Sequence, residues 1–153
     1  MMKKKWIVIL FIFIMAIVSV IVYNNANKKY TSDLAIENGD YVNIHGKIYN
    51  DQAMIDFIEN VLNKEQDEIR TVVYTVEGDP IITDFNYNGS IFIVVKDNSY
   101  DRYSSGGTIK KEFSNLLTYE HRNRLYYSVT NLLEITQADI DNGFDEVILK
   151  YDR

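Results

Sequence analysis

Acidic residues and two histidines are the side chains of this sequence with types suited to chemistry. Asp139, Asp141 and Asp145 crowd around a glycine near the C-terminus, and alternate acids beside a glycine are typical of calcium-binding loops. Counted from Asp139, however, the glycine comes one position too early for an EF-hand loop, and the closing position falls on Lys150. A turn that leads into a strand explains the same residues. Calcium is therefore an alternative to a purely structural turn.

The two histidines, His45 and His121, are the next candidates, and the sequence has no cysteine. Zinc would have to recruit carboxylates for its other ligands, and no pair of histidines has the i, i+4 spacing of a helical site. The sequence also lacks the Gly-x-Ser-x-Gly turn of a serine hydrolase. We assign no catalytic residue, and a small hydrolase that uses the histidines and the acid clusters stays the alternative reading.

The stretch "TVEGDPIITDFNYNG" (75–89) contains the only proline of the chain and three acids. A phosphate-binding loop needs several glycines that enter a helix, which this stretch does not offer. We expect Gly78 to supply an unusual φ and Pro80 to begin a strand, where its missing N–H costs least. Asn88-Gly89 predicts a two-residue hairpin turn. The stretch therefore predicts two turns around one strand.

A glycine- and serine-rich loop at 97–107 carries Tyr100, Arg102 and Tyr103. Tyrosine gives contact area at low entropic cost and is common in protein- and sugar-binding loops. These three residues are the candidates for an interaction surface.

The N-terminus predicts a membrane anchor. Three lysines precede residues 6–23, which contain no charged residue and as a helix would cover about 27 Å of the roughly 30 Å hydrocarbon core. A cleaved signal peptide is the alternative, although the residues at the end of the span fit a cleavage site poorly. The lysines favour a cytoplasmic N-terminus and a domain outside the cell membrane, and the absence of cysteine excludes a lipid-modified cysteine.

The charge of the remaining chain limits its partners. Beyond residue 23 there are 13 Lys and Arg and 22 Asp and Glu, which gives a net charge of 13 − 22 = −9. This charge argues against nucleic acid as a partner and against a domain lying flat on anionic lipid.

The hydrophobic pattern predicts an α+β fold in three parts: an anchor at 1–23, a polar spacer at 24–40 and an extracytoplasmic domain at 41–153. Apolar residues at i, i+3, i+4, i+7 and i+8, from Met54 to Leu62, predict one amphipathic helix, which Asn50 or Asp51 can cap and Asn63-Lys64 ends. Period-two patterns predict strands that form one antiparallel sheet of about five or six. The expected strands cover residues 69–76, 81–87, 90–95, 112–120, 125–130 and 144–151.

Four stretches of the domain carry a family resemblance: "VNIHGKIYN" (42–50), "FIENV" (57–61), "IRTVVYTVEGDPIITDFNYNG" (69–89) and "KDNSYDRY" (96–103). Over about residues 40–103 the domain resembles a bacterial family, the domain of unknown function DUF 4362. Members are often exported lipoproteins, whereas this chain has no cysteine. The resemblance implies an extracytoplasmic domain and brings no catalytic residues or cofactor.

We therefore expect a single-pass, membrane-tethered binding or interaction module without catalytic activity. The partner would be an envelope protein or another ligand that contacts the 97–107 loop or an exposed edge of the sheet.

Overall fold

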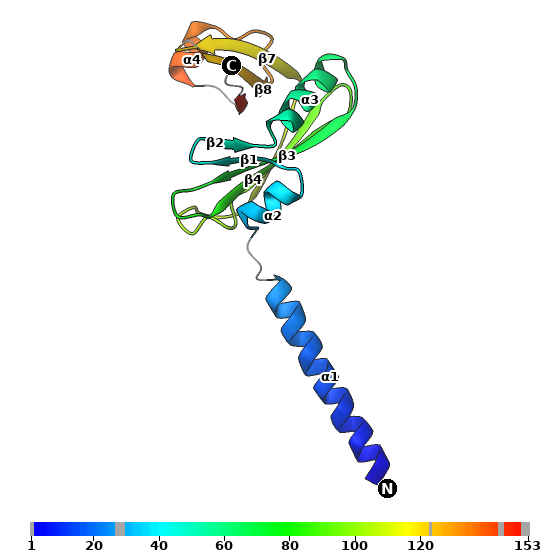
Figure 1. Ribbon diagram of the computed structural model, residues 1–153. Helices are drawn as coiled ribbons and strands as arrows, with labels where there is room; N and C mark the ends of the chain where they lie inside the picture. Colours follow the sequence, from blue (N-terminus) through cyan, green and yellow to red (C-terminus); the bar gives the residue numbers. More distant parts are fainter. Residues whose placement is uncertain (1, 27–29, 123, 144–145, 151–153) are drawn as a thin grey trace. The chain divides into compact units, whose positions relative to one another are not determined.

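The computed structural model describes residues 2–26, 30–122, 124–143 and 146–150 of the 153-residue chain (Figure 1). The chain divides into two compact units, residues 1–30 and 31–153. Each unit is described by itself below.

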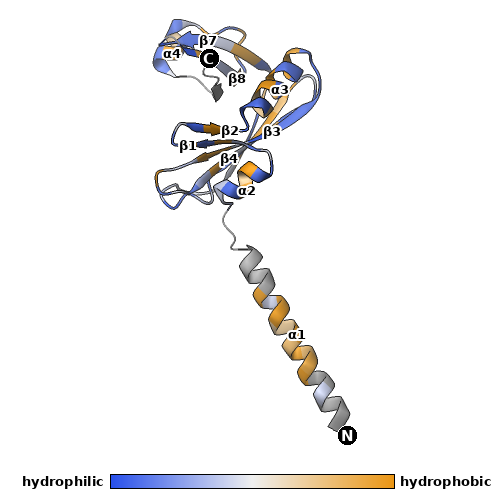
Figure 2. Ribbon diagram, viewed as in Figure 1, coloured by the Kyte–Doolittle hydropathy of each residue, from blue (hydrophilic) through white to orange (hydrophobic). Residues whose placement is uncertain are grey.

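The first unit is the helix α1 (Met2–Ala26). Its apolar side chains between Ile9 and Val20 are exposed, and Figure 2 shows hydrophobic residues along the middle of this helix. Judged on the residues that the structure describes, no helix combines the length and the apolar character needed to cross a membrane.

The second unit has the expected α+β class, with two sheets instead of one. The larger sheet has the strand order β2-β1-β3-β4-β5-β6 and the smaller has the order β7-β8-β9. The helices are α2 (Ser32–Glu37), α3 (Asp51–Leu62) and α4 (Gln137–Asn142). The strands are β1 (Tyr41–Ile44), β2 (Lys47–Tyr49), β3 (Asp67–Tyr74), β4 (Pro80–Tyr87), β5 (Phe92–Asp97), β6 (Thr108–Phe113), β7 (Asn115–His121), β8 (Arg124–Thr130) and β9 (Glu146–Lys150).

Helix α3 forms the core with one face of the large sheet. Its stripe of Met54, Phe57, Ile58 and Val61 is buried, because residues three and four apart lie on the same side of a helix. Phe57 lies 6.3 Å from Phe85 of β4, measured between ring centroids. The last expected member of the stripe, Leu62, is instead 62% exposed at the end of the helix.

The strand pairing corrects the expectation of a purely antiparallel sheet. β1 runs parallel to β3, with Tyr41 opposite Thr71 and Ile44 opposite Tyr74, whereas the other described pairs are antiparallel. The short segment around β1 and β2 has too few residues to show a clear period-two pattern. It joins the sheet through long-range pairing with β3.

The polar spacer expected at 24–40 also contains structure. Thr31 caps α2 by accepting a hydrogen bond from the backbone N–H of Leu34. α2 packs beside β1, and its Ala35 is fully buried. The side chains of Val42 and Val72, which alternate with those facing α3, are also fully buried. The spacer therefore ends before α2, which covers part of the second sheet face.

The turn expected at Asn88-Gly89 differs in its length. Tyr87 pairs with Phe92, so the loop between β4 and β5 has four residues instead of two. Gly89 has φ +92°, and the side chain of Asn88 accepts from the N–H groups of Ser90 and Ile91. At the preceding turn Gly78 has φ +78°, and Pro80 is the first residue of β4.

The strand expected at 112–120 is in fact the end of β6 and the start of β7. Ser114 separates them, and both its N–H and its hydroxyl donate to the side-chain oxygen of Asn131. The last strand is described from Glu146 to Lys150, and residues 144, 145 and 151 of the expected 144–151 strand lie outside the described part.

Asn50 joins the two helices that flank β1. It precedes α3 with φ +54° and makes no side-chain cap of that helix. Its side-chain amide instead donates to the carbonyls of Ile36, at 3.0 Å, and of Asp40, at 2.8 Å. These two bonds fix the reversal between α2 and β1.

We predict that Asn50→Gly lowers the free energy of unfolding by about 1–3 kcal/mol, because two hydrogen bonds are lost while glycine keeps the positive φ. Asn50→Ala should lose about 1 kcal/mol more, because a Cβ is strained at this φ. Urea denaturation of the full chain measures both values. Equal stability of Asn50→Gly and the unchanged protein would contradict the role given to the side chain.

Candidate functional site

A groove of about 740 Å³ lies between the connection from α2 to β1, helix α3 and the first half of β3. It arises because β4 pairs with all eight residues of β3, whereas β1 joins β3 only from Thr71 onward. The small side chain of Ala53 forms part of the helix wall. The lining residues are Asn38, Gly39, Asp40, Ala53, Asp56, Asn60, Asp67, Glu68, Ile69, Arg70, Asp84, Phe85 and Asn86.

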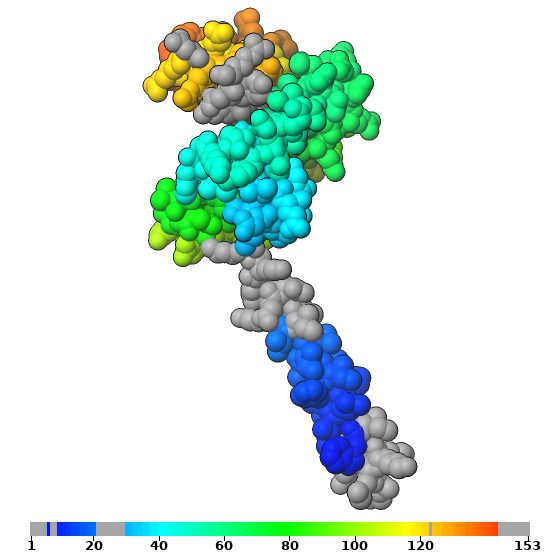
Figure 3. All heavy atoms as spheres, viewed as in Figure 1, coloured from blue at the N-terminus to red at the C-terminus, as the bar shows by residue number. Residues whose placement is uncertain are grey.

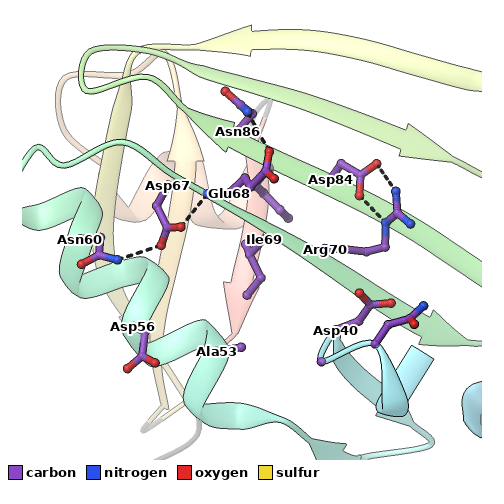
Figure 4. Close-up of a pocket in the computed structure, with 13 residues that line it drawn as sticks. Asp40, Ala53, Asp56, Asn60, Asp67, Glu68, Ile69, Arg70, Asp84 and Asn86 are labelled. Carbon is purple, nitrogen blue, oxygen red and sulfur yellow. Dashed lines mark hydrogen bonds and ion pairs between the residues drawn. The ribbon is translucent and has the colours of Figure 1, made fainter. Parts of the chain in front are cut away.

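The wall formed by β3 and β4 carries an ion pair and a hydrogen bond between neighbouring strands (Figure 4). Arg70 donates to both oxygens of Asp84, from Nε at 2.6 Å and from Nη2 at 3.0 Å. Each of these side chains is 43% exposed. Beside this pair, the amide of Asn86 donates to Glu68 at 3.2 Å. Among the described residues that line the groove, Arg70 is the one cation, and it binds one of the groove's carboxylates.

The opposite wall and the floor meet at Asp67, which is half-buried. One of its carboxylate oxygens accepts from the amide of Asn60 on α3, at 2.9 Å. The other accepts from the backbone N–H of Glu68, at 2.8 Å. Asp67 thus links the helix to the strand and occupies an N–H of β3 at the place where β1 does not reach. We call these walls and floor together the acidic groove.

Five carboxylates line the acidic groove: Asp40, Asp56, Asp67, Glu68 and Asp84. Carboxylates that are exposed or half-buried attract ammonium and guanidinium groups, and hydrogen bonds between such charged groups are stronger than those between neutral ones. Across the part of the chain that the structure describes, no group of three or more His, Asp or Glu residues has the arrangement of a metal site. The carboxylates of the groove are of the kind that binds ammonium and guanidinium groups.

The acids considered for calcium have structural partners. Asp139 and Thr136 form a reciprocal capping box at the start of α4, in which the Thr136 hydroxyl and N–H both donate to the carboxylate. These bonds, the hydroxyl first, lower the pKa of Asp139 below its ordinary value of 3.8. Asp141 accepts from Gln137 at 2.8 Å, and Asp145 lies outside the described residues. The arrangement of the two described acids is that of a helix start.

The histidines are in turns of different sheets. His45 lies between β1 and β2 with φ +52°, and its Nε2 is 2.9 Å from the carbonyl oxygen of Thr75. His121 ends β7, opposite Arg124 in the hairpin with β8. Each histidine therefore lies at the turn of a different hairpin, and the two hairpins are in different sheets.

The candidate interaction loop is tied to the neighbouring turn by Arg102. Its Nε donates to the carboxylate of Asp79 at 2.9 Å, and its Nη2 to the carbonyl of Glu77 at 3.4 Å. The side chain of Asp79 is fully buried, while that of Arg102 is 60% exposed. The hydrogen bond and the charge of Asp79 raise the pKa of Arg102 further above its ordinary value. Arg102 therefore positions the loop, whereas Tyr103 is 80% and Tyr100 36% exposed.

The two edges of the large sheet are β2 and β6. β2 has only three residues. Five of the six residues of β6 are exposed, with Lys110 and Lys111 at its centre. Short strands and lysines are common means of protecting sheet edges against pairing with another chain.

The acidic groove could not be found from sequence spacing. Its acids come from four places along the chain, and they meet only through the registers of β1 and β4 with β3. The one local signal is the alternation in β4, which puts Asp84 and Asn86 on the same face.

The pair of Asp79 and Arg102 predicts that Asp79→Asn changes the urea midpoint in opposite directions with and without Arg102. Arg102→Ala should lower the urea midpoint, because it leaves a buried carboxylate without its cation. Asp79→Asn should lower the midpoint in the unchanged protein and raise it in the Arg102→Ala background, where it removes the buried charge. Lys96→Ala, at an exposed position of β5, is the control. The same sign in both backgrounds would contradict this account.

The capping box predicts a pH effect. A carboxyl whose pKa is lower in the folded protein stabilises it above the unfolded pKa, and the contribution is lost as the pH falls through the folded pKa. NMR titration of Asp139 should thus give a midpoint below 3.8. Thr136→Val should raise this midpoint only part of the way, because the backbone N–H still donates. An unchanged midpoint in Thr136→Val would show that the hydroxyl is not the main cause.

Comparison with known proteins identifies one matching family. Neither the curated proteins nor the solved structures gave a match to this chain. Residues 38–128 match the family described as "Domain of unknown function (DUF4362)", a range that includes the whole acidic groove and confirms the resemblance seen in the sequence. The match covers more than half of the chain, which therefore belongs to this family of domains of unknown function, DUF4362.

Proposed function

We propose that the protein is a membrane-tethered, extracytoplasmic interaction module whose acidic groove binds a basic segment of an envelope protein. The observation that carries the proposal is the lining of the groove, which includes five carboxylates and the guanidinium of Arg70. Lysine or arginine side chains of a partner would be attracted by this excess of negative charge.

The tether is supported by the sequence. Residues 6–23 carry no charge and follow three lysines, and Trp6 and Tyr23 stand where aromatic rings prefer the membrane interface. The apolar side chains of α1 from Ile9 to Val20 are exposed, and exposed apolar surface of this extent is typical of membrane or protein contacts.

The groove also has the form of a binding site. Its volume is within the range of pockets that hold small ligands or single side chains. Its walls come from regular elements, and the bonds of Asp67 and Asp84 hold the carboxylates in place before a partner arrives. Carboxylates fixed in this way lose little entropy on binding.

Charge reversal tests the groove. We predict that Asp56→Lys with Glu68→Lys weakens binding of a tetra-lysine peptide to the full chain in detergent by at least about tenfold at low salt. The two reversals remove two attractions and add two repulsions, four changes of about 0.2–1 kcal/mol each, and each 1.4 kcal/mol is tenfold in affinity. Isothermal titration calorimetry measures the change.

The matched control is Glu59→Lys with Glu65→Lys, which changes the net charge equally at exposed positions outside the groove. This variant should bind the peptide nearly as well as the unchanged protein. Equal weakening in both double variants would mean that the peptide responds to net charge, and the proposal would fail.

A further inference from the structure

The turn 75–79 and the loop 98–107 form an exposed tip at one end of the second unit. Val76 in the turn is 86% exposed, and Tyr103 in the loop is 80% exposed. Arg102 holds the two segments together through Asp79 and Glu77. The tip therefore presents an aliphatic and an aromatic side chain to solvent on a fixed frame.

The same end carries the start of the second unit. β1 and β3 are parallel, so the end of β1 at Ile44 lies beside the end of β3 at Tyr74, and the bond of His45 to Thr75 joins their following turns. The chain reverses between α2 and β1, which returns the start of α2 at Thr31 toward this end. Figures 1 and 3 show α2 and the tip together there.

The length of the chain limits how far this end can lie from a bilayer. α1 is described to Ala26, and the five steps from there to Thr31 span at most about 18 Å when fully extended. An eight-residue strand such as β3 is longer, about 26 Å. If residues 6–23 span the membrane, the start of the second unit lies within reach of the lipid surface, and the tip is at the same end of that unit.

We propose that the tip docks on the lipid surface, with Tyr103 and Val76 entering the interface between head groups and acyl chains. This inference rests on the membrane tether of the proposed function. Tyrosine prefers this depth because its ring is apolar and its hydroxyl is polar.

The charges of the tip favour neutral lipid. The carboxylate of Asp79 is buried against Arg102, and that of Asp101 accepts from the N–H of Tyr103. Glu77 is exposed, so the tip has three carboxylates and one guanidinium and anionic lipid would repel it. Contact is therefore driven by the apolar and aromatic side chains, and phosphatidylcholine is sufficient.

The test uses the full chain reconstituted in phosphatidylcholine vesicles. In Trp6→Phe with Tyr103→Trp, the one tryptophan of this variant should emit at shorter wavelength than free tryptophan in water, and phospholipids with brominated acyl chains should quench its emission. The control is Trp6→Phe with Leu133→Trp, because Leu133 is 90% exposed and follows β8. Its emission should be neither shifted nor quenched.

The outcomes separate this inference from the tether. A chain that stays in the vesicles through an alkaline wash while tryptophan 103 is unquenched keeps the tether and overturns the docking. A chain removed by the wash overturns both. Quenching that requires added phosphatidylglycerol would also overturn the inference, since charge would then drive the contact.

Discussion

The parallel pairing of β1 with β3 begins only at Thr71, and the other main features of the second unit depend on this register. Because β1 enters the sheet so late, the chain must reverse just before it, and Asn50 stabilises that reversal through the carbonyls of Ile36 and Asp40. The first residues of β3 then lack a second neighbouring strand, which opens the acidic groove. The same reversal places the start of α2 beside the tip.

The acidic side chains of the protein lie in two kinds of environment, buried beside a cation or exposed to water. Asp79 is fully buried and has Arg102 beside it, because a buried carboxylate without a partner is costly. The carboxylates of the groove remain exposed or half-buried, where water and salt reduce their mutual repulsion. The first arrangement serves the geometry of two loops, and the second keeps the carboxylates in contact with water. A net count of acids in the sequence does not separate them.

The sequence was sufficient to predict the elements whose signals are local. The stripe of α3 and the alternation of β4 each follow from the period of one element, and Gly78 and Pro80 mark a turn by their own backbone limits. The elements that the sequence did not predict depend on residues far away along the chain. β1 is a strand because of β3, and β6 stops at Ser114 because Asn131 holds that residue.

The bond between Asp67 and the N–H of Glu68 also affects how copies of the chain meet each other. An open strand is a template on which another strand can add, and repeated addition is the first step toward ordered aggregates. Asp67 occupies a donor at the start of β3, where this strand has β4 but not β1 beside it, and Lys110 and Lys111 lie at the centre of the edge strand β6. A strand of another copy therefore meets an occupied donor at the first place and positive charge at the second.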